Sequence, residues 1–139
     1  MPVTYSIDET AGIVRVECFG ELTNQDILDC VARLYTDPAR KPGMPSLVDC
    51  CGIDRMVVTP SGIQAAVMVK ATMVDPRQPP WAVAVIAPQD EVFWMARTYE
   101  VLREGSPEKV RVFRQPSEAE KWLATGHPSP PPASPPAIL

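Results

Sequence analysis

Apolar and polar residues alternate along two segments near the start of the chain, residues 3–7 and 13–19. Alternation of this kind is typical of β-strands that bury one face and expose the other. Ala11 and Gly12 lie between the two segments and provide a turn. The pattern therefore predicts an antiparallel β-hairpin in this part of the chain.

The rest of the sequence switches repeatedly between helical periodicity and short strand-like segments, which is the pattern of an α/β protein. Helices are expected to begin at Thr23, Thr59, Asp90 and Ser117. Strands are expected over residues 46–51, 81–87 and 109–114. We expect a single α/β domain, residues 1–124, with a mixed sheet of about five strands and about four helices packed on it.

Proline marks where this domain should end. Of the 17 prolines, six lie between residues 128 and 136, where neither a helix nor a strand can form. We therefore expect residues 125–139 to be a disordered, proline-rich tail with extended backbone. His127, the one histidine of the chain, falls in that tail.

Charge and cysteine spacing exclude several classes of protein. The chain carries 13 Lys and Arg against 17 Asp and Glu, with no dense basic segment, so nucleic-acid binding is not expected. No Cys-x-x-Cys pair is present, and a single histidine argues against His-rich zinc sites and haem ligation, so no metal and no cofactor are expected. The longest apolar run, around residues 65–69, is too short to span a membrane. With no secretory signal at residues 1–10, we expect a cytoplasmic protein with free thiols.

The order of elements, with Leu47-Val48-Asp49 on a middle strand, resembles that of the SpoIIAA-like proteins, relatives of the STAS domains of anti-sigma-factor antagonists. Residues 92–97 are similar to their third helix, and residues 112–123 to their last strand and helix. The resemblance spans residues 3–124. It implies a small cytoplasmic α/β domain that usually binds something rather than catalysing a reaction.

The resemblance also draws attention to Ser61, because antagonist proteins accept phosphate on a serine that precedes a glycine at a helix start. Ser61-Gly62 occupies a comparable place, and a phosphate there would face free backbone N–H groups. Thr59-Pro60 stands where the antagonists have an Asp and usually a further Ser. Ser61 is therefore either a phospho-acceptor or an ordinary residue of the first helical turn.

Two positions on the middle strand could carry chemistry. Asp49 is either a ligand group at a strand end, near the crevice where α/β sheets bind ligands, or the acceptor for a nearby loop amide. Cys50 and Cys51 should point to opposite faces. An enzyme that uses one of these thiols would need an exposed thiolate with a lowered pKa.

The second helix is apolar almost all round, so it should be covered on two sides. One side should pack on the sheet, and the other against a helix, a second subunit or an apolar ligand. A ligand would require a pocket lined by Met68, Met73 and Trp94. Phe93, Trp94 and Arg97 flank the buried stripe of the third helix and are candidates for core or interface packing.

The function expected from these patterns is that of a non-enzymatic, SpoIIAA-like regulatory or protein-interaction domain, which self-associates as a homodimer or binds a protein partner. The alternative is a protein that binds a small apolar or lipid-like molecule.

Overall fold

A computed structural model describes residues 2–125 of the chain. Its five strands form one sheet in the order β1-β2-β3-β4-β5. Their bounds are β1 (Val3–Asp8), β2 (Ile13–Leu22), β3 (Ser46–Met56), β4 (Trp81–Ile86) and β5 (Glu108–Phe113). β1 runs antiparallel to β2, and the other neighbours are parallel. The predicted hairpin and mixed α/β sheet are confirmed. Residues 126–139 of the predicted tail lie outside the described range.

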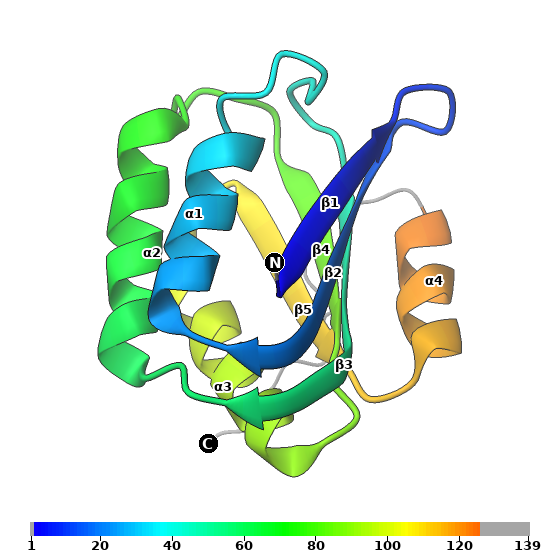
Figure 1. Ribbon diagram of the computed structural model, residues 1–139. Coiled ribbons are helices and arrows are strands. Elements are labelled where there is room, and N and C mark those ends of the chain that lie inside the picture. The colour runs from blue at the N-terminus through cyan, green and yellow to red at the C-terminus, as the bar shows by residue number, and fades with distance from the viewer. Residues whose placement is uncertain (1, 126–139) are drawn as a thin grey trace.

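Four helices cover the two faces of this sheet unequally (Figure 1). Their bounds are α1 (Asn24–Leu34), α2 (Pro60–Met73), α3 (Asp90–Leu102) and α4 (Pro116–Ala124). Parallel crossovers are right-handed, and the strand order advances steadily across the sheet. The three crossover helices α1, α2 and α3 therefore share one face, and α4 lies on the other.

The starts of α1 and α2, expected at Thr23 and Thr59, are each capped by the side chain of that threonine. Thr23 and Asp26 form a reciprocal capping box, in which the Asp26 amide donates to the Thr23 hydroxyl and the Thr23 amide donates to the Asp26 carboxylate. Thr59 caps α2 by accepting from the Gly62 amide at 3.1 Å, and Pro60 takes the first helical position.

The middle strand is longer than expected, because β3 continues beyond residue 51 to Met56. It pairs with the far end of β2 through two register irregularities, after Glu17 and after Gly20. Gly52 allows this close approach, since a Cβ there would lie 3.0 Å from the Cβ of Phe19. The glycine and the polar residues of this segment hide its strand character in the sequence.

The two faces of the sheet build two separate cores. On the α4 side, a small core joins strand residues to the last helix: Leu47, Ala82, Ala84, Ile86, Phe113, Ala119 and Trp122. On the side of α1, α2 and α3, a larger core contains most of the other buried side chains. No helix within residues 2–125 is both long enough and apolar enough to cross a bilayer.

Candidate functional site: an interior cavity with a charged end

A cavity of about 180 Å³ lies between the sheet and the three crossover helices. The sheet contributes short side chains here, because positions of β3 and β4 that face the helices carry Ser46, Val48, Cys50, Val83 and Val85. Such side chains do not reach far enough to fill the space below the helices. The small side chains in the middle of the sheet therefore leave the cavity unfilled.

Helix α2 forms the roof of this space. It packs against α1 on one side and α3 on the other. Three of its inward residues, Ile63, Ala66 and Lys70, line the cavity, and all three are buried. Neighbouring helices thus supply the cover expected for one side of α2, and the cavity lies between the helix and the sheet on which the other side was expected to pack.

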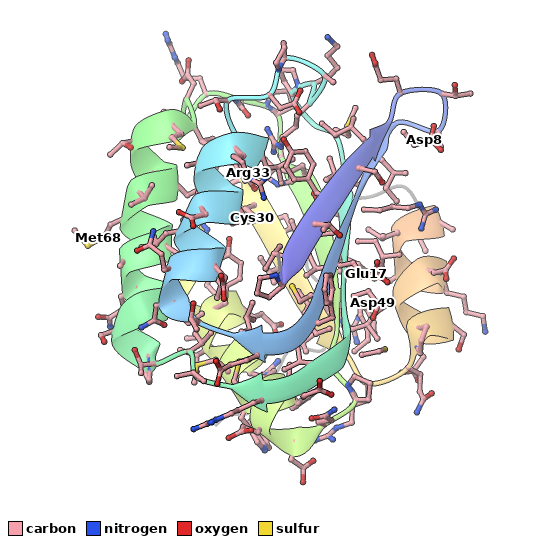
Figure 2. The ribbon with its side chains drawn as sticks, viewed as in Figure 1. Asp8, Glu17, Cys30, Arg33, Asp49 and Met68 are labelled. Carbon is pink, nitrogen blue, oxygen red and sulfur yellow. The ribbon has the colours of Figure 1, made fainter. Side chains whose placement is uncertain are left out.

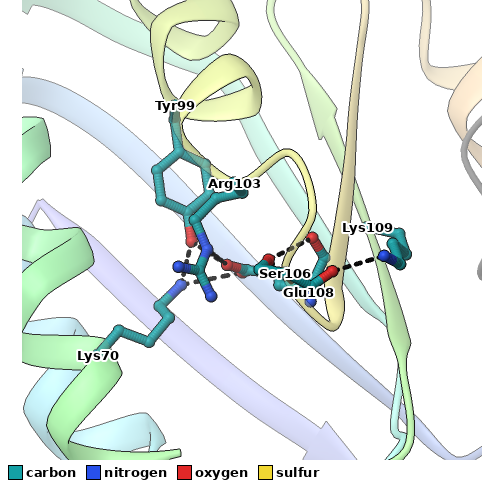
Figure 3. Close-up of polar contacts among 6 residues, drawn as sticks. All are labelled: Lys70, Tyr99, Arg103, Ser106, Glu108 and Lys109. Carbon is teal, nitrogen blue, oxygen red and sulfur yellow. Dashed lines mark hydrogen bonds and ion pairs between the residues drawn. The ribbon is translucent and has the colours of Figure 1, made fainter. Parts of the chain in front are cut away.

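One end of the cavity is charged, although its walls are otherwise mainly apolar. Figure 3 shows the polar contacts of this charged end. Glu108, the first residue of β5, is 1% exposed and accepts three side-chain hydrogen bonds. Lys70 Nζ donates a hydrogen bond to its Oε2 at 2.9 Å. Its Oε1 accepts hydrogen bonds from the Tyr99 hydroxyl at 2.5 Å and from Arg103 Nε at 2.7 Å. Lys70 Nζ also donates to the Tyr99 hydroxyl oxygen.

This cluster lies where the last turns of α2 and α3 meet the start of β5. Lys70 lies in the last turn of α2, and Arg103 is the C-terminal cap of α3. Helix C-termini carry partial negative charge, which stabilises cations placed there. The two helices and one strand thus bring two cations onto one carboxylate inside the protein.

The charges of the cluster stabilise each other. Burial alone lowers the pKa of Lys70, but attraction to Glu108, aided by Tyr35 and Tyr99, raises it well above its usual value. Burial alone raises the pKa of Glu108, but Lys70, Tyr99 and Arg103 outweigh burial and lower it. The pKa of Tyr99 is raised by burial and by Glu108. At neutral pH the lysine is therefore charged, the glutamate ionised and the tyrosine neutral.

An aromatic wall adjoins the charged end. The Tyr35 ring centroid is 4.8 Å from Lys70 Nζ and 4.2 Å from the guanidinium carbon of Arg40, which also lies 5.0 Å from the Trp81 ring. Within residues 2–125, four buried side-chain polar atoms lack a hydrogen-bond partner: Arg40 Nε, Arg40 Nη2, Gln78 Oε1 and Trp81 Nε1. Three of these four atoms are donors on Arg40 and Trp81.

Three thiols also line the cavity, on Cys18, Cys30 and Cys50. A hydrogen bond with Cys18, together with burial, raises the pKa of Cys50 well above its usual value, and burial raises that of Cys30 to about 11. Cys51 points to the opposite face, as predicted, and is exposed. Burial and Asp49 raise its pKa to about 11. Both candidate thiols thus have raised pKa values, the opposite of what a thiol-based mechanism requires.

The pocket expected between Met68, Met73 and Trp94 is not present as predicted, because none of these residues lines the cavity. Helix α2 turns Ala66 and Lys70 inward, which places Met68 on the outside with 70% of its surface exposed (Figure 2). Trp94 is 61% exposed on α3.

The other candidates on α3 also lie outside the cavity. Phe93 is half-buried, and its ring lies 5.2 Å from that of Trp94 and 4.1 Å from the guanidinium carbon of Arg114. Arg97 is exposed and pairs with Glu100 on the same helix at 2.8 Å. Phe93 packs against the larger core, as one of its two predicted roles allowed, whereas Trp94 and Arg97 belong to the outer surface of α3.

Asp49 lies within β3 rather than at its end, so the strand-end interpretation is wrong. The strand order has no reversal, so the sheet lacks the crevice at which doubly wound sheets bind ligands. The carboxylate accepts from the Cys51 amide at 2.9 Å and lies beside Glu17 on the face that carries α4 (Figure 2). Asp49 therefore acts as a local backbone acceptor, but within its own strand rather than in a loop.

Ser61 is exposed in the first turn of α2, and its hydroxyl lies 3.1 Å from that of Thr59. Asn24 of α1 joins this helix start: its side-chain oxygen accepts from the Thr59 amide at 3.0 Å, and its nitrogen donates to the Thr59 hydroxyl at 3.2 Å. Phosphorylation of Ser61 stays a prediction.

Sequence reasoning missed the charged end altogether. Lys70 looks like one of the few polar interruptions on an apolar helix, and Glu108 precedes the expected last strand. The available signal was the position of Lys70, which lies at helical spacing from Ile63 and Ala66 and so belongs to the buried side of α2. Its partners lie 29 and 38 residues further along the chain.

No family model matches the chain, and no curated protein matches it either. Among solved structures, it is similar to an uncharacterized protein of the DUF3478 family with a SpoIIAA-like fold from Shewanella loihica PV-4. The match covers 87% of this chain and 93% of the other, with a TM-score of 0.55 and 16% sequence identity. The likeness confirms the fold expected from the sequence: the chain has a SpoIIAA-like fold.

Proposed function

We propose that this protein is a non-enzymatic binding domain whose ligand is a small apolar molecule held in the interior cavity. The observation that carries the proposal is the cavity itself, about 180 Å³ beneath α2 with mainly apolar walls. An engineered cavity of about 150 Å³ lined by leucine, isoleucine and phenylalanine side chains binds benzene. The space here therefore suits a molecule somewhat larger than benzene.

The state of the groups around the cavity favours binding over catalysis. The lysine is held as a cation, the glutamate as an anion and the thiols in their protonated forms, so each is poorly suited to exchange protons near neutral pH. A general base or nucleophile would need a pKa nearer the working pH. These fixed charge states suit recognition.

The test uses hexan-1-ol as a neutral apolar probe, with binding followed by amide chemical shifts in an NMR titration. Ala66→Leu extends a side chain into the cavity, so we expect at least about tenfold weaker binding, while the free energy of unfolding stays within about 1 kcal/mol of wild type or rises. Ala71→Leu is the matched control, because Ala71 is exposed on the same helix. Saturable binding that both variants retain equally would contradict the proposal, as would no binding to the wild type.

A second candidate is the regulatory or protein-interaction role, favoured by the exposed apolar residues of α3. Trp94, Arg97 and Val101 follow one another at helical spacing on its outer surface. Tryptophan and arginine are enriched among the residues that dominate protein interfaces. On this account, a second copy of the chain covers the surface.

Self-association can be measured by sedimentation equilibrium on the full chain. If α3 forms the interface, the wild type is dimeric at micromolar concentration, and Trp94→Glu shifts it to a monomer. Glu120→Lys, an exposed change on α4 across the sheet, should leave the dimer intact. A monomeric wild type up to millimolar concentration would remove this candidate and leave the cavity proposal untouched.

A further inference from the structure

The charged end of the cavity carries an N–H donor for which residues 2–125 provide no hydrogen-bond acceptor. A lysine ammonium has three N–H donors. In Lys70 two of them are used, by the Tyr99 hydroxyl oxygen and by Glu108 Oε2. No third acceptor for Lys70 Nζ is present among residues 2–125, and Lys70 lines the cavity. The structure therefore leaves one charged donor available to a molecule in the cavity.

Positive charge also exceeds negative charge at this end. Within the described part of the chain, Glu108 is the one carboxylate that forms an ion pair with Lys70 or Arg103, so two cations share one anion. Arg40 adds a further cation across the Tyr35 ring from the side of the loop that follows α1. A buried excess of positive charge favours an anion that can approach it without water.

A cationic ligand finds no comparable partner. A carboxylate offers about four lone-pair sites, and Glu108 already accepts from Lys70, Tyr99 and Arg103. Its remaining capacity is small, and an ammonium group in the cavity would face the ammonium of Lys70. The charged end therefore favours a ligand with a negatively charged head group over one with a positively charged head group.

We propose that the cavity binds a small apolar carboxylate, with its hydrocarbon part among the apolar side chains and its carboxylate accepting the free N–H of Lys70. This inference rests on the proposed function, because it names the chemical class of the molecule that occupies the same cavity. The apolar walls determine the size and shape of the hydrocarbon part, and Lys70 determines the head group.

The experiment compares three probes with the same six-carbon chain on the wild-type protein at pH 7: hexanoate, hexan-1-ol and hexylamine. Hydrogen bonds to a charged group are worth more than neutral ones. We expect hexanoate to bind at least about tenfold more tightly than hexan-1-ol, and hexylamine to bind more weakly than both. Dissociation constants come from amide chemical shifts.

The variant Lys70→Met keeps the length of the side chain and removes its charge. We expect it to lose the preference for hexanoate and to bind hexan-1-ol about as well as the wild type does. Lys109→Met is the matched control, because Lys109 follows Glu108 on β5 but does not line the cavity. If Lys70→Met does not fold, the comparison of the three probes on the wild-type protein is sufficient to test the carboxylate inference.

The outcomes separate the two proposals. If hexan-1-ol binds but hexanoate binds no more tightly, or hexylamine binds best, the carboxylate inference is wrong and the cavity proposal stands. If none of the three probes binds, the cavity proposal fails and the inference fails with it. Retained hexanoate preference in folded Lys70→Met would also overturn the inference.

Discussion

Glu108 is the residue on which the interior electrostatics depend, because a carboxylate buried so deeply is tolerated only when its charge is compensated. Lys70 and Arg103 compensate it directly, and the Tyr99 hydroxyl satisfies a further lone pair. Removing one member of such a group leaves the others charged and without partners, which costs more free energy than the intact pair contributes.

A double-mutant cycle at Lys70 and Glu108 measures this coupling. We expect Lys70→Met alone to lower the free energy of unfolding by about 3–5 kcal/mol, and Glu108→Gln alone by a similar amount. The double variant should lose much less than the sum, because no unpaired charge of the pair stays buried. Urea unfolding gives the three differences. Additive losses would show that the two side chains do not act as a pair.

At the scale of elements, the structure depends on how the starts of α1 and α2 are joined. Asn24 of α1 hydrogen-bonds the backbone and the hydroxyl of Thr59, the cap of α2. The side chain of Asn24 occupies the space beside Gly62, where an added Cβ would lie 1.9 Å from its oxygen. The glycine is thus required by the neighbouring helix, and its own backbone conformation does not demand it.

This junction predicts that Gly62→Ala lowers the free energy of unfolding in the wild type but raises it in an Asn24→Ala variant. In the wild type, Gly62→Ala displaces Asn24 and breaks its bonds to Thr59, so we expect a loss of about 1 kcal/mol in the free energy of unfolding. In an Asn24→Ala background the space is empty, and Gly62→Ala should gain about 0.5–1 kcal/mol because alanine favours the helix. Thermal unfolding of the four proteins measures both values. The same effect in both backgrounds would contradict the contact.

For the whole molecule, the buried glutamate links stability to acid pH. Burial raises the pKa of Glu108, but Lys70 on α2, with Tyr99 and Arg103 on α3, outweighs burial and lowers that pKa below the usual value of a glutamate in the folded protein. The unfolded chain therefore binds a proton at this residue more readily than the folded one. The resulting stabilisation is complete above about pH 4.5 and is lost as the pH falls through the folded-state pKa.

The free energy of unfolding should accordingly decrease as the pH is lowered from about 5 to 3, with Glu108 contributing to the slope. Glu108→Gln has no titrating group at this position, so its free energy of unfolding should fall less steeply over the same pH interval. At pH 5 that free energy is already lower than in the wild type. Urea unfolding at a series of pH values gives both slopes. An unchanged slope in Glu108→Gln would show that this carboxylate titrates alike in both states.

The sequence alone was sufficient for the elements and the class of fold. Alternation in β1 and β2, the capping residues Thr23 and Thr59, and the apolar strand β4 are local patterns, and each specifies local structure without help from distant residues. The end of β3 was missed because its pairing with β2 beyond Gly52 depends on a partner strand rather than on its own pattern.

The candidate site could not be derived in the same way. Lys70, Tyr99 and Glu108 lie on three different elements, and nothing in their local sequence shows that they meet. Likewise, the cavity depends on the distance between α2 and the sheet, which the packing of α2 on α1 and α3 sets. The sequence by itself determined which segments are helices and strands, because helix and strand formation depends on near neighbours in the chain. Only the tertiary structure decided that small side chains leave a space beneath α2 and that a lysine, a tyrosine and a glutamate meet at its end, because both depend on contacts between residues far apart in the chain.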